Sequence, residues 1–185
     1  MSHGAEVPGK GPAQDLRPAG ALGAATGALD WLNRQLVVLS MLALLAAAGV
    51  LTSSVVTRYL FKYPTEWQDE ASVFLMVGCT FLVGAYVQSY RGHVGIEALA
   101  GVLPPGLNRV RLVFADAVSL LFTTFFSWKS WTLLHEAVSE RQTTSSSWGP
   151  PLWIPYGMMT VGMTLVALQL LLQLLGRLAR PAGAR

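Results

Sequence analysis

The chain has 185 residues, of which 52% are hydrophobic and only 12% are charged. A soluble domain carries about 25% charged residues, so this composition excludes an ordinary soluble globular protein and favours an integral membrane protein. The formal net charge is +3. The basic residues lie at the ends of apolar stretches and do not form a patch with aromatic residues, so the sequence does not indicate a nucleic-acid partner.

Four long apolar stretches follow one another along the chain. Residues 35–57, 71–90 and 152–176 contain no Asp, Glu, Lys, Arg or His, and residues 112–134 contain only Asp116 and Lys129. About 20 apolar residues cross a bilayer as a helix, and lipid forces the backbone to satisfy its hydrogen bonds internally. The sequence therefore predicts an all-α integral membrane protein. Its membrane domain is residues 31–178, with helices at about 35–57, 71–90, 110–134 and 152–176.

The flanking segments predict the orientation of these helices. Residues 1–30 are rich in Gly, Ala and Pro and lack the short apolar core of a secretory signal, so we expect a disordered tail, with a second tail at 179–185. Nine basic residues lie in the two terminal regions and around the 91–111 connection, against three in the other two connections. Positive residues stay on the cytoplasmic side. Both termini are therefore expected in the cytoplasm, and the first and third connections outside.

The second connection has a helical apolar pattern of its own. Ile96, Leu99, Ala100 and Leu103 have i, i+3, i+4, i+7 spacing, and residues 104–106, Pro-Pro-Gly, end it. This pattern predicts a short helix lying in the cytoplasmic membrane interface.

Residues that carry chemistry are few. The sequence has no Cys/His cluster with zinc spacing and no Gly-rich phosphate loop, and the single Cys79 cannot form an intramolecular disulfide. We interpret Cys79 as a small packing residue. His93 and His135 fall on opposite sides of the predicted membrane, so they cannot share a metal or a haem. We therefore expect no enzyme activity, no cofactor and no metal site.

Asp116 and Lys129 are ionisable residues inside a predicted span, and such residues are functional hypotheses by default. They lie 13 positions apart, about 20 Å along one helix, so they cannot pair with each other. The favoured interpretation is that each side chain reaches or pairs at a membrane interface.

The first connection combines a cation with an acidic run. Arg58 ends the first helix, and Glu66, Trp67, Asp69 and Glu70 open the second, where carboxylates suit the positive end of the helix dipole. We expect Arg58 to pair with Glu70, with Trp67 on the same helical face as Glu70. Two interpretations carry equal weight: a locally satisfied corner, and a docking surface for a soluble partner.

Several short motifs together resemble a known family. They are Arg58-Tyr59-x-Phe61, Trp67-x-x-Glu70, Arg91-x-His93-Val94 and Trp153-Ile154-Pro155-Tyr156-Gly157. In this order over four helices, across roughly residues 31–176, they resemble the small membrane (Q) subunit of tripartite ATP-independent periplasmic (TRAP) transporters. The chain departs from the family in its bulky 148–151 segment and its long N-terminal tail.

This resemblance implies a bacterial inner-membrane scaffold subunit. In the family, a large membrane subunit carries substrate and sodium, and a periplasmic binding protein delivers a carboxylate-bearing organic acid without ATP. The expected contacts are therefore these two proteins and membrane lipids. The expected interface residues are Arg58, Trp67, Asp69, Glu70, Arg91, His93, Asp116 and Lys129. Two alternatives stay open: the small subunit of a tripartite tricarboxylate transporter, and a stand-alone membrane protein such as an electron-transfer subunit.

Overall fold

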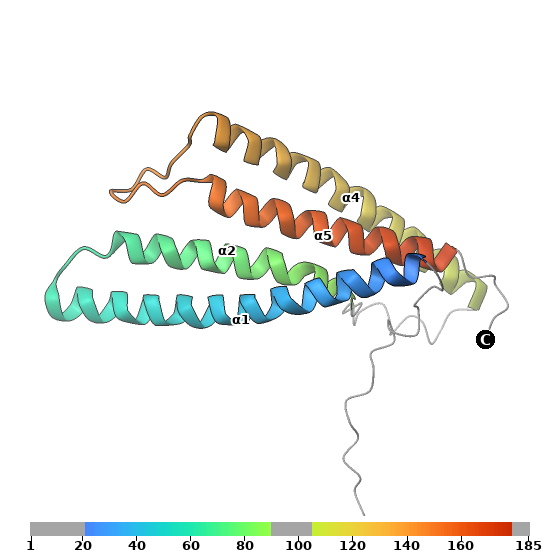
Figure 1. The fold of residues 1–185 in the computed structure, drawn as a ribbon, viewed down its shortest axis with the longest axis horizontal. Helices are drawn as coiled ribbons and strands as arrows, with labels where there is room; N and C mark the ends of the chain where they lie inside the picture. The colour runs from blue at the N-terminus through green and yellow to red at the C-terminus, as the bar shows by residue number, and fades with distance from the viewer. Residues whose placement is uncertain (1–20, 90–104, 179–185) are drawn as a thin grey trace, which may run out of the picture.

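A computed structural model describes residues 21–89 and 105–178 of the chain. These described residues form four helices, named α1 (Ala21–Phe61), α2 (Glu66–Ser89), α4 (Pro105–Ser139) and α5 (Trp153–Leu178) (Figure 1). All four are long and apolar enough to cross a membrane, which confirms the predicted all-α architecture with four spans. The predicted interfacial helix, Arg91, His93 and the segments 1–20 and 179–185 lie outside the described residues.

The helices are longer than the apolar stretches that predicted them. α1 has 41 residues and begins at Ala21, so residues 21–30, which we expected to be disordered tail, are helical. The prediction of disorder rested on the Gly and Pro residues of the tail. It gave too little weight to the alanines, although Ala is the strongest helix former. α4 has 35 residues and starts with Pro105, a residue that suits the first helical position because its missing N–H has no helical partner there.

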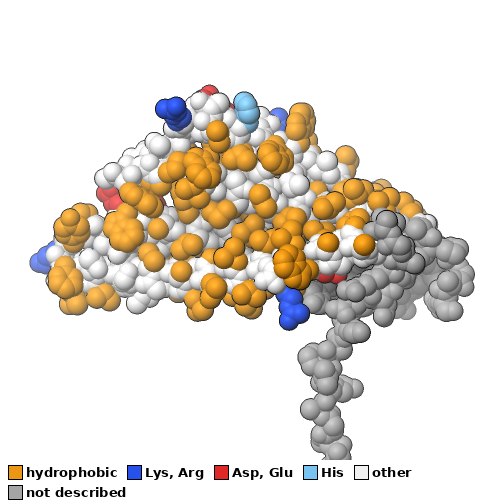
Figure 2. Space-filling view, viewed as in Figure 1, with side chains coloured by type: hydrophobic (Ala, Val, Ile, Leu, Met, Phe, Trp, Pro, Cys, Tyr) orange, Lys and Arg blue, Asp and Glu red, His pale blue; other side chains and the backbone are white. Residues whose placement is uncertain are grey.

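The four helices form a single row in the order α1, α2, α5, α4 (Figure 1). α1 and α2 make one antiparallel hairpin and α4 and α5 make the other, while α2 packs against α5 in the middle. α1 touches α5 only lightly. Because a row buries little of each helix, large apolar side chains remain exposed along its length, as Figure 2 shows for one face.

The middle contact of the row depends on a glycine. Gly162 in α5 lies so close to the backbone of Phe81 in α2 that a Cβ atom at position 162 would be 2.6 Å from the Phe81 carbonyl carbon. Small residues permit such close approach where no hydrophobic force drives helices together in lipid.

Hydroxyl groups connect α4 and α5 within their hairpin. Thr160 donates to the backbone oxygen of Ser130 at 3.1 Å, and the hydroxyls of Ser127 and Thr164 lie 3.0 Å apart. The indole Nε1 of Trp131 donates to Thr164 at 3.2 Å. These contacts fix the register of α4 against α5, and interhelical hydrogen bonds of this kind stabilise helix pairs within lipid.

Two connections lie at the same end of the row, residues 62–65 between α1 and α2 and residues 140–152 between α4 and α5 (Figure 1). We call this the loop end. The candidate residues of the first connection, Arg58, Trp67, Asp69 and Glu70, lie at this end.

Candidate docking surface at the loop end

A polar network joins the end of α1 to the start of α2. Arg58 donates from Nη2 to Asp69 at 2.6 Å and to the Thr65 hydroxyl at 2.8 Å. Ser54, one turn earlier in α1, donates to Thr65 at 2.8 Å and lies 3.0 Å from the second Asp69 oxygen. Thr65 and Ser54 are buried, whereas Arg58 and Asp69 are about half exposed. The network therefore has a dry base and a solvent-accessible top.

The sequence explains why this corner folds as it does. Lys62 has a φ of 51°, a left-handed conformation that ends α1. Thr65 then caps α2, and its carbonyl accepts hydrogen bonds from the N–H groups of Gln68 and Asp69. Arg58 lies in the last turn of α1 and Asp69 in the first turn of α2. Each charge therefore sits at the helix end whose dipole stabilises it.

The expected pair between Arg58 and Glu70 is wrong, because Asp69 takes that place. Asp69 lies four residues after Thr65, so both share the helical face that meets α1. Glu70 is rotated a further 100° around α2. Its Oε2 is buried and has no hydrogen-bond partner among the described residues.

A second set of contacts ties the two hairpins together at the loop end. Glu66 accepts a hydrogen bond from the Ser147 hydroxyl at 2.6 Å and lies 3.4 Å from the Ser147 N–H. The rings of Trp67 and Trp148 meet edge to face, with centroids 6.4 Å apart and an angle of 73° between the planes. We call this pair of contacts the clasp. The sequence predicts Trp67 on the helical face of Glu70 and gives no indication that the 148–151 segment contacts Trp67.

The connection that carries Ser147 and Trp148 folds back on itself. The Leu152 N–H donates to the Gln142 carbonyl at 2.9 Å, and the Thr144 N–H donates to the Pro150 carbonyl at 3.0 Å. Gly149 has a φ of 58°, a conformation that favours glycine because in other residues the Cβ comes too close to the backbone carbonyl oxygen there. This folding holds Trp148 against Trp67.

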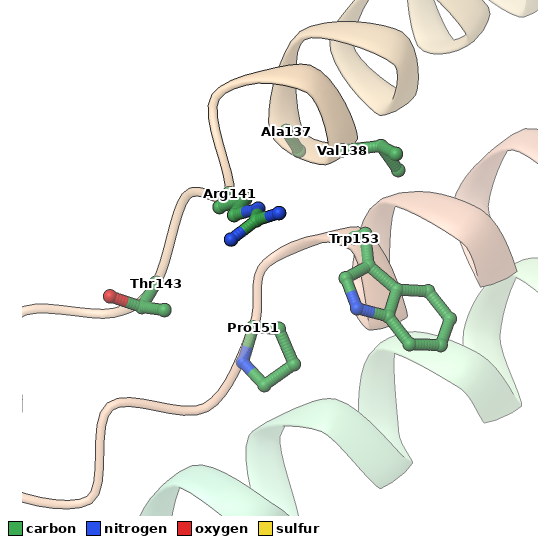
Figure 3. Close-up of a pocket in the computed structure, with 6 residues that line it drawn as sticks. All are labelled: Ala137, Val138, Arg141, Thr143, Pro151 and Trp153. Atoms are coloured by element: carbon green, nitrogen blue, oxygen red, sulfur yellow. The ribbon is translucent and has the colours of Figure 1, made fainter.

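A hollow of about 340 Å³ opens between this connection and the ends of its helices (Figure 3). Its lining is mainly apolar, with Arg141 as the only charged residue: Ala137, Val138, Arg141, Thr143, Pro151 and Trp153. The sequence did not predict it, because the lining comes from two helix ends and a folded loop. The loop end thus presents carboxylates, basic side chains, exposed tryptophans and a shallow hollow.

The sequence of this chain matches a known protein family. The family described as tripartite ATP-independent periplasmic transporters, DctQ component, matches residues 47–180. The chain belongs to this family. It is therefore a transporter component and not an enzyme, and with four apolar helices it is a multi-pass protein of the inner membrane. The resemblance predicted from the motifs is confirmed, and the family match favours it over the two alternatives, a tricarboxylate-transporter subunit and a stand-alone membrane protein.

Two relatives of this DctQ-family chain are informative. The C4-dicarboxylate TRAP transporter small permease protein DctQ of Vibrio cholerae is 25% identical over 140 residues, which cover 64% of this chain and 60% of the relative. The isethionate TRAP transporter permease protein DctMQ of Oleidesulfovibrio alaskensis is 25% identical over 182 residues, which cover 93% of this chain and 28% of the relative. The chain thus spans less than two thirds of either relative. No solved structure matches the chain.

The other predicted residues do not join the loop end. Asp116 and Lys129 are both in α4, where Asp116 is half-buried and Lys129 is exposed. Lys129 places its ammonium 5.2 Å from the centre of the Trp128 ring. Within the described residues, no group of three or more His, Cys, Asp or Glu side chains is arranged to hold a metal ion.

Proposed function

We propose that this chain is the scaffold subunit of a TRAP-type transporter that imports a small organic acid with a sodium gradient. A large membrane subunit would carry the substrate, and a periplasmic binding protein would deliver it. The observation that carries the proposal is the single row of four helices with exposed apolar side chains along it. A row of this kind leaves wide surfaces for another membrane protein or for lipid.

The relatives support the partner and the substrate class. The Oleidesulfovibrio relative is named as a DctMQ permease, and this chain matches only 28% of its length, so a protein similar to this one occurs fused to a much larger one. The two relatives are named for a C4-dicarboxylate and for isethionate, both small organic anions.

We further propose that the loop end faces the periplasm and meets the binding protein. The distribution of basic residues favours this orientation. Glu66 and Arg141 are exposed and Asp69 is half exposed, so the loop end offers charges of both signs, which suit the recognition of a soluble protein surface.

Reconstitution tests the function. Liposomes containing this chain, the large subunit and the binding protein should accumulate the organic acid when a sodium gradient is imposed. Liposomes lacking this chain, or containing it alone, should not. Uptake by the chain alone would refute the scaffold role.

Single-cysteine labelling tests the orientation in a Cys79→Ala background. An impermeant thiol reagent added to intact cells should label Ser145→Cys in the loop end and leave Gly95→Cys unlabelled. The opposite pattern would place the loop end in the cytoplasm and contradict the docking role.

A further inference from the structure

A guanidinium lies over the hollow at the base of the α4–α5 connection. Arg141 directly follows the last turns of α4 and is exposed, and its side chain makes no hydrogen bond or ion pair with any other described residue. Figure 3 shows the guanidinium pointing from the connection into the space between the end of α4 and Trp153. A guanidinium carries five N–H donors in a planar fork and no acceptor, so this space offers donors to an anion.

The remaining lining of the hollow is mainly apolar. Val138, Pro151 and Trp153 contribute to its walls, and its volume is about 340 Å³. The acidic residues nearest to Arg141 in the sequence, Glu136 and Glu140, do not line it, and Glu140 accepts a hydrogen bond from Gln142 at 2.8 Å. The hollow therefore combines one positive charge with apolar walls. An occupant that suits both is amphipathic, with an anionic group beside an apolar part.

The ends of two apolar helices set the level of the hollow in the membrane. Charged residues return to α4 at His135 and Glu136, and the uncharged stretch that contains α5 begins at Leu152. The hydroxyl contacts between α4 and α5 fix their antiparallel register and place Val138 level with the start of α5. The hollow thus lies at the boundary between hydrocarbon and headgroups, a zone that also favours tryptophan.

Apolar surface continues from the hollow toward the hydrocarbon core. Trp131 precedes Val138 by seven residues, so the two lie on the same face of α4, and both are exposed. This surface suits an acyl chain, which a free anion does not possess. In the other direction the connection extends past the hollow (Figure 1), so a soluble protein would meet its tip first. These placements favour a lipid as the occupant.

We propose that the hollow binds a phospholipid, with the phosphate on Arg141 and the glycerol and upper acyl chain against the apolar lining. Arginine suits this role because its fork can donate two parallel N–H···O bonds to a phosphate. Phospholipid phosphates lie at both membrane surfaces, so the site does not depend on which side the loop end faces. The bound lipid would fill the space under the connection that holds Trp148, and would brace it against the ends of its own helices.

Native mass spectrometry of the purified chain measures this binding. Dioleoylphosphatidylglycerol is titrated beside two probes that each carry one part of its chemistry. Dioleoylglycerol has the chains without the phosphate, and inorganic phosphate has the anion without the chains. The phospholipid should bind about tenfold more tightly than dioleoylglycerol, because only the phosphate accepts charge-assisted hydrogen bonds. Inorganic phosphate in large excess should not displace it.

Three variants locate the site. Arg141→Gln should weaken phospholipid binding about tenfold and leave dioleoylglycerol binding unchanged. Lys62→Gln is the matched control, because Lys62 is also an exposed cation with a left-handed backbone that follows a helix at the loop end, and it does not line the hollow. Val138→Trp fills the hollow from an exposed position, keeps Arg141, and should weaken binding of both lipids. Circular dichroism confirms that each variant retains its helices.

Five results would overturn the proposal. Equal phospholipid affinities of Arg141→Gln and the unaltered chain would show that the guanidinium does not hold the phosphate. An equal loss in Lys62→Gln would show that any cation at the loop end attracts the lipid. Unchanged binding in Val138→Trp would place the lipid outside the hollow, and displacement by inorganic phosphate would make it a site for a free anion. If Arg141→Gln instead weakens binding of the periplasmic binding protein, with lipid binding unchanged, the hollow belongs to a protein partner.

Discussion

Replacing Gly162 with alanine should separate the two hairpins. The added Cβ would be 2.6 Å from the carbonyl carbon of Phe81 and 2.9 Å from its Cβ. Carbon atoms pack best at about 3.5–4.0 Å, so α2 and α5 must move apart by about 1 Å. The obstacle is helix backbone, which cannot rotate away. Overpacking of this kind costs about 1–3 kcal/mol, and we expect the upper part of that range because the atoms in the way belong to helix backbone.

Two other glycines provide matched controls. A Cβ at Gly78 would meet the Met158 sulfur at 2.5 Å, but this is a flexible side chain that can turn aside. A Cβ at Gly49 meets nothing within 4 Å. We expect Gly78→Ala to cost less than about 1 kcal/mol, and Gly49→Ala to be neutral or slightly stabilising because alanine favours helix.

The assay is equilibrium unfolding in mixed detergent micelles, followed by circular dichroism and tryptophan fluorescence. The unfolding free energy should fall most for Gly162→Ala. If this variant unfolds no more easily than Gly78→Ala, the α2–α5 contact is looser than the structure shows, and the argument from backbone contact is refuted.

Two further predictions concern the loop end. Asp69→Asn should lower the unfolding free energy by up to about 1 kcal/mol, since its ion pair with Arg58 is half exposed. The charge swap Arg58→Asp with Asp69→Arg should recover part of that loss. If the swap of Arg58 with Glu70 recovers more, the rejected Arg58–Glu70 pair is restored. Trp148→Ala removes an edge-to-face contact worth about 0.5–1.5 kcal/mol, so hydrogen exchange in residues 140–152 should quicken. Trp31→Ala, an exposed tryptophan of α1 far from the loop end, is the control, and equal exchange in the two variants would show that the clasp does not order this loop.

Hydropathy was enough to find the four spans, because lipid imposes the same requirement for a long apolar helix at each one. It could not set the true start of α1, since the Ala-rich turns before Trp31 lie outside the uninterrupted apolar stretch 35–57 and are helical all the same. Hydropathy also carries no information about which helix lies beside which. The row order depends on fits such as Gly162 against Phe81, which appear only when the helices are placed together.

The loop end shows the same limit at the scale of single side chains. Sequence identified Arg58 and the acidic run correctly as neighbours, but the choice between Asp69 and Glu70 depends on where Thr65 caps α2, one residue of register. The clasp joins residues about 80 positions apart, so nothing local in either segment indicated it. Trp67 and Trp148 were the only indication of the clasp in these two segments, and the sequence does not show that they meet.

The row of helices also has a mechanical consequence. Bending any one helix along its axis strains its hydrogen-bond ladder, so the row is stiff in that direction. Across the axes it consists of two hairpins, α1–α2 closed by the short connection 62–65 and α4–α5 closed by the longer folded connection 140–152. The two hairpins meet at the α2–α5 seam, where Gly162 makes backbone contact in the middle, the clasp closes one end and Gln88 and Gln173 hydrogen-bond at the other. A load applied to one hairpin is therefore passed to the other along the whole α2–α5 contact, and movement between the hairpins concentrates along that line.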